Sequence, residues 1–361
     1  MPSRGNNMES SSRGPETAGK RALFRREKSV IKGRSSLAAL ILLVALLLWL
    51  PLFASRYIVY VATLIMINVI CSQGLNVLTG YTGQVSLGNG AFMAIGAYLT
   101  AILCNNYHLS FWPVLLIAPL VSGIVGVLVA VPALRLKGLY LAMVTVAFHM
   151  VVALGLISLD ITGGYEGIDV ARPRIGSAVL NTERDFYYLA FAICLFIVVL
   201  VVNLSRTKIY RAFIAIKERE ISAQSIGISL WGYKTLAFFL ASVYAGVAGC
   251  LFAVTMGHIT PNHFPLMLSI EYVMAIIVGG PGSIPGVILG SALITMLPFF
   301  LIFLSQKLGV FFPILIVQFA NVKIMAYGAI IVFFLMYVPG GFRGIMMRFS
   351  ESFPATGLEN R

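Results

Sequence analysis

The sequence has few charged residues, and acidic residues are especially scarce. Charged side chains occupy 11% of the 361 positions, whereas soluble domains carry about 25%. No Asp or Glu lies between Lys28 and Leu159, and Glu271 is the only carboxylate within an apolar run. Ion-coupled transporters bind their coupling ion at carboxylates buried in their helices. The scarcity therefore argues against a self-driven transporter and favours an energy source on another subunit.

Residues that usually build catalytic and metal sites are also scarce. The four cysteines are scattered through or beside apolar segments, without the CxxC spacing of a metal or redox site. The four histidines never pair at a ligand spacing with a cysteine or a carboxylate, and no G-x-S-x-G nucleophile motif occurs. We therefore expect no metal, no cofactor and no enzymatic activity.

Hydrophobic residues, by contrast, make up 59% of the chain. They are gathered in long runs, many of them close to the roughly 20 residues that an α-helix needs to cross a bilayer. The pattern predicts an all-α polytopic membrane protein with about ten transmembrane helices. The apolar runs fall at 36–54, 57–79, 89–105, 111–134, 138–158, 186–204, 231–256, 268–280, 286–304 and 324–339.

The positive charge predicts how the chain is oriented and divided. The net charge is +13, but nine of the 26 Lys and Arg residues lie in the first 34 positions and most of the others flank apolar runs. The positive-inside rule explains this distribution without nucleic acid, and it predicts that both termini are cytoplasmic and loop 159–185 is external. We expect a disordered basic tail at 1–35, a membrane domain at 36–345 and a cytoplasmic C-terminal tail at 346–361.

Two glycine-rich stretches interrupt the apolar pattern. Residues 79–98 read TGYTGQVSLGNGAFMAIGAY, and residues 279–286 read GGPGSIPG. Irregular backbone survives at membrane depth only where protein or a water-filled cavity satisfies its polar groups, so such breaks mark transport pathways. The alternative is a tight cytoplasmic turn between two helices. The residues that we predict to line a pathway are Gly80, Gly83, Gln84, Ser86, Asn89 and Glu271.

Small residues also recur at helical spacing in two of the runs. Each set falls on one helix face, where small side chains allow a neighbouring backbone to approach closely. The spacing therefore predicts helix packing at these two faces. Their members are Gly90, Ala94, Ala97, Ala101, Ser242, Gly246, Gly249 and Ala253.

Segment 206–229 is a polar stretch between two apolar runs and carries the pattern of an amphipathic helix. Five isoleucine and phenylalanine residues recur at roughly helical spacing with charged residues between them, and Gly227 follows in the position of a C-terminal cap. A short amphipathic helix of this kind fits the groove of a partner protein. A helix lying on the lipid surface would have the same pattern.

Six segments together resemble one known family, the membrane subunits of ABC importers for branched-chain amino acids, of the LivM type. They include GLNVLTGYTGQVSLGNGAFMAIGAYLTAIL, RAFIAIKEREISAQSIGIS and SIEYVMAIIVGGPGSIPGVILGSAL, and they occur in family order over about residues 57–343. The resemblance implies a permease in the bacterial inner membrane. It also implies two ATP-binding subunits, a second permease subunit and a periplasmic substrate-binding protein as partners.

The resemblance further identifies 206–229 as the segment that docks on an ATP-binding subunit. In the family motif E-A-A-x-x-x-G, Ala223 and Gly227 match, Ile221 and Ser222 replace the first two residues, and Glu220 stands one position earlier. Relatives of similar sequence carry urea, short amides or aromatic acids, and a self-contained secondary transporter or channel is the alternative class. The residues that the resemblance assigns to coupling are Arg211, Ala215, Glu218, Glu220, Ala223 and Gly227.

Overall fold

The computed structural model describes residues 34–136, 138–175, 178–179, 182–308, 319–337, 340–342 and 344. The predicted tails at 1–35 and 346–361 lie almost wholly outside these residues. The chain divides into two compact units, Met1–Ser55 and Arg56–Arg361. In the first unit the described part is one helix, α2 (Arg34–Phe53), which carries Pro51 in its last turn.

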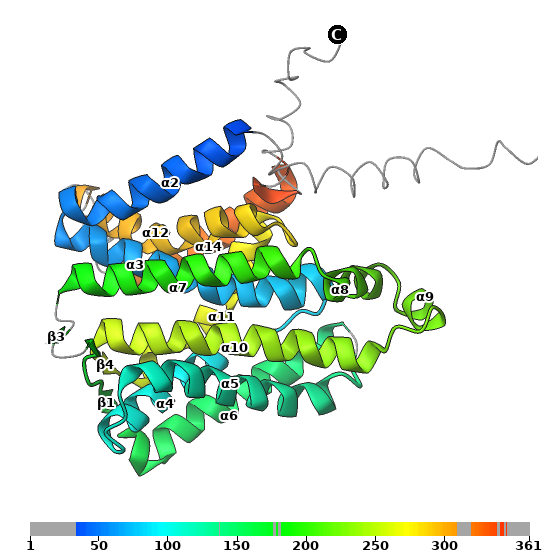
Figure 1. Cartoon of the computed structure of the whole chain (residues 1–361), viewed down its shortest axis with the longest axis horizontal. Helices are drawn as coiled ribbons and strands as arrows, with labels where there is room; N and C mark the ends of the chain where they lie inside the picture. Colours follow the sequence, from blue (N-terminus) through cyan, green and yellow to red (C-terminus); the bar gives the residue numbers. More distant parts are fainter. Residues whose placement is uncertain are drawn as a thin grey trace, which may run out of the picture. The chain divides into compact units, whose positions relative to one another are not determined.

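The second unit is a helical bundle (Figure 1). Some of its helices begin with a side-chain cap: Thr182 and Asp185, for example, form a capping box at the start of α7. The longer helices of this unit are α3 (Arg56–Leu75), continued by the π-helix η1 (Asn76–Tyr81), α4 (Asn89–Asn105), α5 (Phe111–Ala133), α6 (Leu139–Ser158), α7 (Glu183–Leu204), α10 (Leu230–Met256), α11 (Leu266–Gly279), α12 (Ile284–Leu308) and α14 (Phe319–Tyr337).

Among the described residues, seven helices are long and apolar enough to cross a membrane. The chain is therefore a mostly helical, polytopic protein, as the sequence predicts. Three shorter apolar helices, Val44–Phe53, Asn89–Asn105 and Ile324–Phe334, fall below that length. Each apolar run of the sequence is helical over its described residues, with ends that differ by a few positions. The count of ten crossings stays a prediction.

Helix α10 lies at the centre of the bundle and packs against α3, α4 and α5. Its contact with α4 is a contact between backbones: a Cβ on Gly96 would collide with the Gly246 carbonyl oxygen, and one on Gly249 would collide with that of Met93. The main hydrophobic core surrounds this contact. A second, smaller core joins α11, α12 and α14 around Met274, Ile294 and Tyr327.

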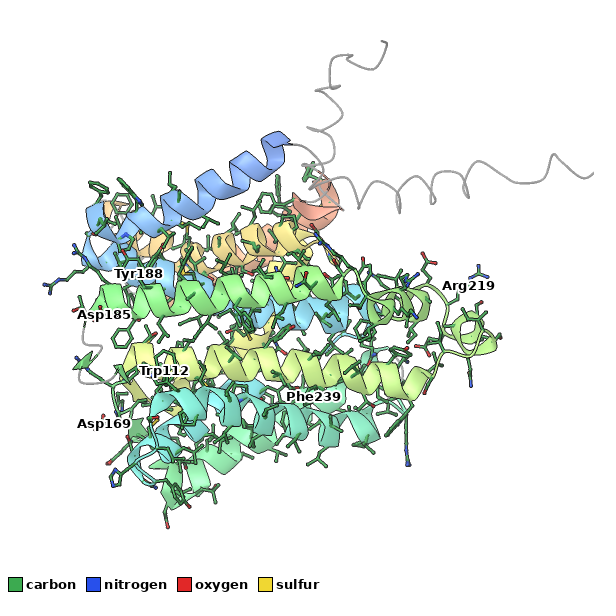
Figure 2. All side chains as sticks on the ribbon, in the orientation of Figure 1. Trp112, Asp169, Asp185, Tyr188, Arg219 and Phe239 are labelled. Carbon is green, nitrogen blue, oxygen red and sulfur yellow. The ribbon has the colours of Figure 1, made fainter. Side chains whose placement is uncertain are left out.

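Short elements cap the two ends of the bundle. At one end β1 (Ile168–Asp169) pairs antiparallel with β4 (His258–Ile259), beside the one-turn helices η2 (Asp160–Thr162) and η3 (Pro261–His263) and the ribbon β2–β3 (Arg174–Ile175, Ala178–Val179). At the other end lie α8 (Lys208–Glu218) and α9 (Glu220–Ser225). Figure 2 places Asp169 and Asp185 at the first end and Arg219 at the second.

The single amphipathic helix predicted over 206–229 is instead two helices. The backbone extends at Arg219, with φ −156° and ψ 107°, and this one residue both ends α8 and precedes α9. The hydrophobic face is consequently split. Phe213 and Ile216 are buried, whereas Ile221 and Ile226 are 82% and 74% exposed, because after the kink Ala223 of α9, and not these isoleucines, faces the bundle.

Candidate functional site

The first glycine-rich break begins as a π-helix and ends as irregular backbone. Helix α3 widens into η1 at Asn76, and the chain then runs without regular structure from residue 83 to residue 88 before α4 begins. The Thr82 hydroxyl donates to the Leu78 carbonyl (2.6 Å), and Gly83 leaves the helix with φ +74°. Single π turns occur frequently at functional sites, so this junction is the natural place to look for one.

The predicted pathway side chains of this break are buried. Gln84, Ser86 and Asn89 are at most 5% exposed. Gln84 Nε2 donates to Thr82 Oγ1 (3.1 Å), and Asn89 Nδ2 donates to the Cys71 carbonyl (3.2 Å). The amide oxygens of Gln84 and Asn89 have no hydrogen-bond partner among the described residues. Each amide is thus held by its nitrogen, and its oxygen is left to accept a further hydrogen bond.

The two breaks meet although about 200 residues separate them in sequence. The Gly282 N–H donates to Asn76 Oδ1 (2.9 Å), and Gln73 Nε2 donates to the Ile284 carbonyl (2.9 Å). A Cβ on Gly80 would lie 2.6 Å from the Gly282 nitrogen, so only glycine fits there. The second break is a tight turn that closes directly on the first.

A string of polar groups leads from the break into the bundle. Asn89 Nδ2 lies 3.3 Å from Cys71 Sγ, and the Cys71 thiol contacts the Tyr272 hydroxyl. That hydroxyl donates to Asn68 Oδ1 (3.1 Å), beside a small polar cavity that includes Glu271. The structure therefore connects Glu271 to Asn89 through side chains of α3 and α11. The polar residues that line the cavity are Asn68, Ser72, Glu271, Tyr272, Ser291 and Thr295.

The residues assigned to coupling occupy different environments. Ala223 is 1% exposed and fixes α9 to the bundle, while Gly227 takes φ +83° and its N–H donates to the Gln224 carbonyl, as expected for a residue just past a helix end. Arg211 and Glu218 are exposed, and Ala215 is half-buried. The structure gathers them on one short segment, with α9 facing outward.

Two lysines that the sequence analysis missed hold this segment. Lys234 of α10 is 8% exposed, and its Nζ lies 2.7 Å from Glu220 Oε1 at the start of α9. Lys217 of α8 donates from Nζ to the Gly80 carbonyl (2.6 Å). A signal for Lys234 did exist, since a lone cation inside an apolar run requires a partner. Glu220 thereby gains a definite contact.

The small residues of α4 do not share one neighbour. Gly90 donates its N–H to Ser269 Oγ of α11 (2.9 Å), and Ala94 lines a second small cavity with His149 of α6. Ala97 lies against Gly249 of α10. Gly246 packs on Pro119 and Ser122 of α5. This face of α4 therefore contacts α11 near its start and α10 farther along the helix.

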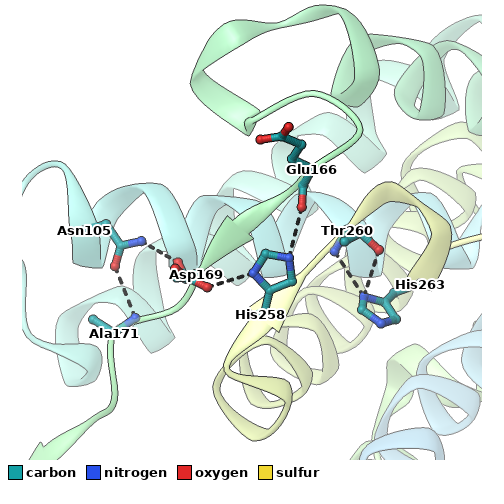
Figure 3. A network of polar contacts seen from close by, with 7 residues as sticks. All are labelled: Asn105, Glu166, Asp169, Ala171, His258, Thr260 and His263. Carbon is teal, nitrogen blue, oxygen red and sulfur yellow. Dashed lines mark hydrogen bonds and ion pairs between the residues drawn. The ribbon is translucent and has the colours of Figure 1, made fainter.

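At the opposite end, an exposed histidine joins three segments (Figure 3). His258 Nδ1 lies 2.7 Å from Asp169 Oδ1, and Nε2 lies 3.0 Å from the Glu166 carbonyl. Both partners are acceptors, which suits the protonated ring. The hydrogen bond to Asp169 raises the pKa of His258 above its ordinary value. Asn105 of α4 completes the cluster by bonding the backbone at Asp169 and Ala171.

Known proteins resemble this chain over most of its length. A family described as the branched-chain amino acid transport system / permease component matches residues 57–339. The high-affinity branched-chain amino acid transport system permease protein LivM of Escherichia coli K12 is 36% identical over 293 residues, which cover 74% of this chain and 68% of LivM.

More distant relatives include the autoinducer 2 import system permease protein LsrC of Escherichia coli, 27% identical over 73% of this chain and 79% of LsrC. A probable branched-chain amino acid transport permease protein LivH of Methanocaldococcus jannaschii is 25% identical over 63% of this chain and 74% of LivH. No solved structure matches significantly. The chain therefore belongs to the branched-chain amino acid permease family: it is a multi-pass membrane permease of an ATP-driven system that works with an ATPase and other subunits, and it is not itself an enzyme.

Proposed function

We propose that this chain provides the route by which branched-chain amino acids enter the cell. It pairs with a second permease subunit, two cytoplasmic ATP-binding subunits and a periplasmic substrate-binding protein. The observation that carries the proposal is the series of neutral polar groups from Asn89 to the cavity that Glu271 lines, in a chain 36% identical to LivM.

The chemistry of this string suits a hydrophobic zwitterion. Amide and hydroxyl groups offer hydrogen bonds to both ends of an amino acid, and neutral partners bind it less tightly than full charges would. A permeant must enter and leave, so weak binding is an advantage. The surrounding side chains are mostly apolar, which suits the side chains of Leu, Ile and Val.

The distribution of charge supports the orientation. Loop 206–229 carries five basic residues against two acids, and it lies at the opposite end of the bundle from β1 and β4 (Figure 1). We infer that the α8 end is cytoplasmic. With α2, α4 and α14 counted as crossings, the chain passes the membrane ten times and both termini are cytoplasmic. The membrane domain then spans 36–345 between the tails at 1–35 and 346–361.

Helix α9 is the part that docks on an ATP-binding subunit. Ile221 and Ile226 present apolar surface outward, and such surface beside charged residues is typical of protein interfaces. The Glu220–Lys234 ion pair and the buried Ala223 hold α9 from behind. Glu220 thus anchors the docking helix, in place of a direct contact with the partner.

Uptake into proteoliposomes tests the proposal. The complex is purified through a tag on this chain, reconstituted with its binding protein, and supplied with radiolabelled L-leucine. We expect uptake that requires ATP and survives a protonophore, and that excess isoleucine or valine inhibits but urea, acetamide and phenylalanine do not. Uptake driven by a proton gradient without ATP would contradict the mechanism, and inhibition by urea alone would contradict the substrate.

A further inference from the structure

Lys217 joins the coupling segment to the first break by a direct contact. Its Nζ donates to the Gly80 carbonyl at 2.6 Å, although 137 residues separate the two. The stem of the lysine crosses the exposed Gly83, where an added Cβ would lie 3.2 Å from Lys217 Cγ. The side chain thus contacts the break at both Gly80 and Gly83, although Lys217 is itself exposed.

The Gly80 carbonyl requires such a donor. In a continued helix it would accept a hydrogen bond from an N–H four or five residues later. The Gln84 N–H instead donates to Leu78, because Gly83 turns the chain away with φ +74°. Gly80 therefore belongs to the last carbonyls of a helix, where partial negative charge gathers and a lysine is stabilising.

A second contact fixes α8 to the same turn. The rings of Tyr210 and Tyr81 meet edge to face with centroids 4.8 Å apart, and Phe213 of α8 is fully buried. On its far side, η1 holds the second break through Asn76 and Gly282. A displacement of α8 therefore reaches both breaks through η1.

We infer that Lys217 is a positioning residue that makes the break follow the coupling segment when the ATP-binding subunits move. The inference rests on the proposed function, and it goes beyond it by naming the contact that transmits the motion. Helix α8 and η1 move as one body in this scheme. Without the lysine, ATP hydrolysis continues, but the break no longer moves together with α8.

The first test compares Lys217→Met, Lys217→Arg and Lys208→Met in the reconstituted complex. Lys208 is exposed on the first turn of the same helix, about 14 Å along the axis from Lys217. We expect leucine uptake per ATP hydrolysed to fall about threefold to tenfold in Lys217→Met, as for loss of one hydrogen bond of ordinary strength, and to stay near normal in the other two variants. Equal ratios in Lys217→Met and Lys208→Met would overturn the inference.

The second test replaces the lysine by a covalent link. A Cβ on Gly83 would lie 3.8 Å from the Lys217 Cβ, within the range that a disulfide spans. The pair Gly83→Cys with Lys217→Cys should have low uptake per ATP when reduced and regain the level of the Gly83→Cys single variant when oxidised. Oxidation that instead abolishes uptake would mean that α8 and the break must separate, and would overturn the inference.

The two proposals fail in different ways. If the unmodified complex takes up no leucine with ATP, the proposed function is wrong. If it does, and the Lys217 variants couple normally, only the role of Lys217 is wrong. Co-purification of the ATP-binding subunits shows whether Lys217→Met assembles. If it does not, the comparison of the reduced and oxidised cysteine pair tests the role of Lys217.

Discussion

The two ends of the bundle solve the problem of polar groups in opposite ways. At the α8 end, the amides of Gln84 and Asn89 are buried and neutral, and each keeps an oxygen without a partner among the described residues. At the β1–β4 end, His258 and Asp169 are exposed, and the two side chains are partners of one another.

The unpaired amides of the α8 end are suited to contact with a passing molecule, whereas the His258–Asp169 contact holds two segments together; we call this contact the clamp. Unused acceptors inside a protein cost free energy, and they persist where another molecule uses them. An exposed ion pair contributes little stability, but here it joins β1 to β4 and so fixes the connection between α10 and α11. We therefore propose that the α8 end contacts the transported molecule and that the β1–β4 end holds the helices together.

The largest contrast is in accessibility from the two sides of the membrane. Cysteines placed at the exposed positions Gln224 and Tyr165 should label oppositely with an impermeant maleimide, position 165 from the periplasm and position 224 only after the membrane is permeabilised. The native cysteines 71, 104 and 250 are buried, and the unmodified chain measures their background. Labelling of position 224 in intact cells would contradict the proposed orientation of the chain.

A charge on the docking helix should nearly abolish transport. Ile221→Asp places a carboxylate in the proposed apolar interface, and we expect uptake to fall roughly tenfold or more, as at interface hot spots. The matched variant is Leu159→Asp, at a residue that is 54% exposed at the other end, and it should leave leucine uptake near normal. An equal loss of uptake in both variants would contradict the docking role of α9.

Removing a pathway amide should have a moderate effect. Asn89→Leu and Gln84→Leu keep the side-chain size but lose the hydrogen bonds, so we expect leucine uptake to fall about threefold to tenfold with assembly and basal ATP hydrolysis unchanged. Asn105→Leu makes the same change at the other end and should alter uptake little. If the first two variants reduced only the amount of assembled complex, the stretch would be a structural turn.

The smallest effect concerns pH at the clamp. Because the pKa of His258 is raised in the folded protein, its contribution is complete below about pH 6.5, the ordinary value, and disappears as the pH rises through the folded pKa. The Val170 N–H, which donates to the Gly257 carbonyl, should lose about twofold to fivefold of its hydrogen-exchange protection. His258→Gln should make that protection independent of pH over this range, and a pH dependence that persists in this variant would show that His258 is not its cause.

The helices could be predicted from the sequence because their signal is local. Runs of apolar residues determine where a helix can cross lipid, and each run matches a helix over the described residues. The break at 79–90 also has a local cause, its glycines. Its π turn does not, because that geometry depends on Gly80 approaching Gly282 from the other break.

The site could be predicted only in part, since its key contacts join distant residues. Nothing near Lys217 in the sequence points to Gly80, and Glu220 gains its partner Lys234 only once α9 folds back towards α10. The kink at Arg219 could not be predicted for a related reason: the hydrophobic spacing continues through it, although the isoleucines beyond it are exposed.

The backbone contact between α4 and α10 restricts where a permeant can travel. With the Gly246 carbonyl in contact with Gly96 and that of Met93 in contact with Gly249, the two helices leave no room for even a methyl group at these positions. We therefore expect an amino acid that starts at Asn89 to pass elsewhere than between α4 and α10. This contact between backbones would keep that side of the route closed.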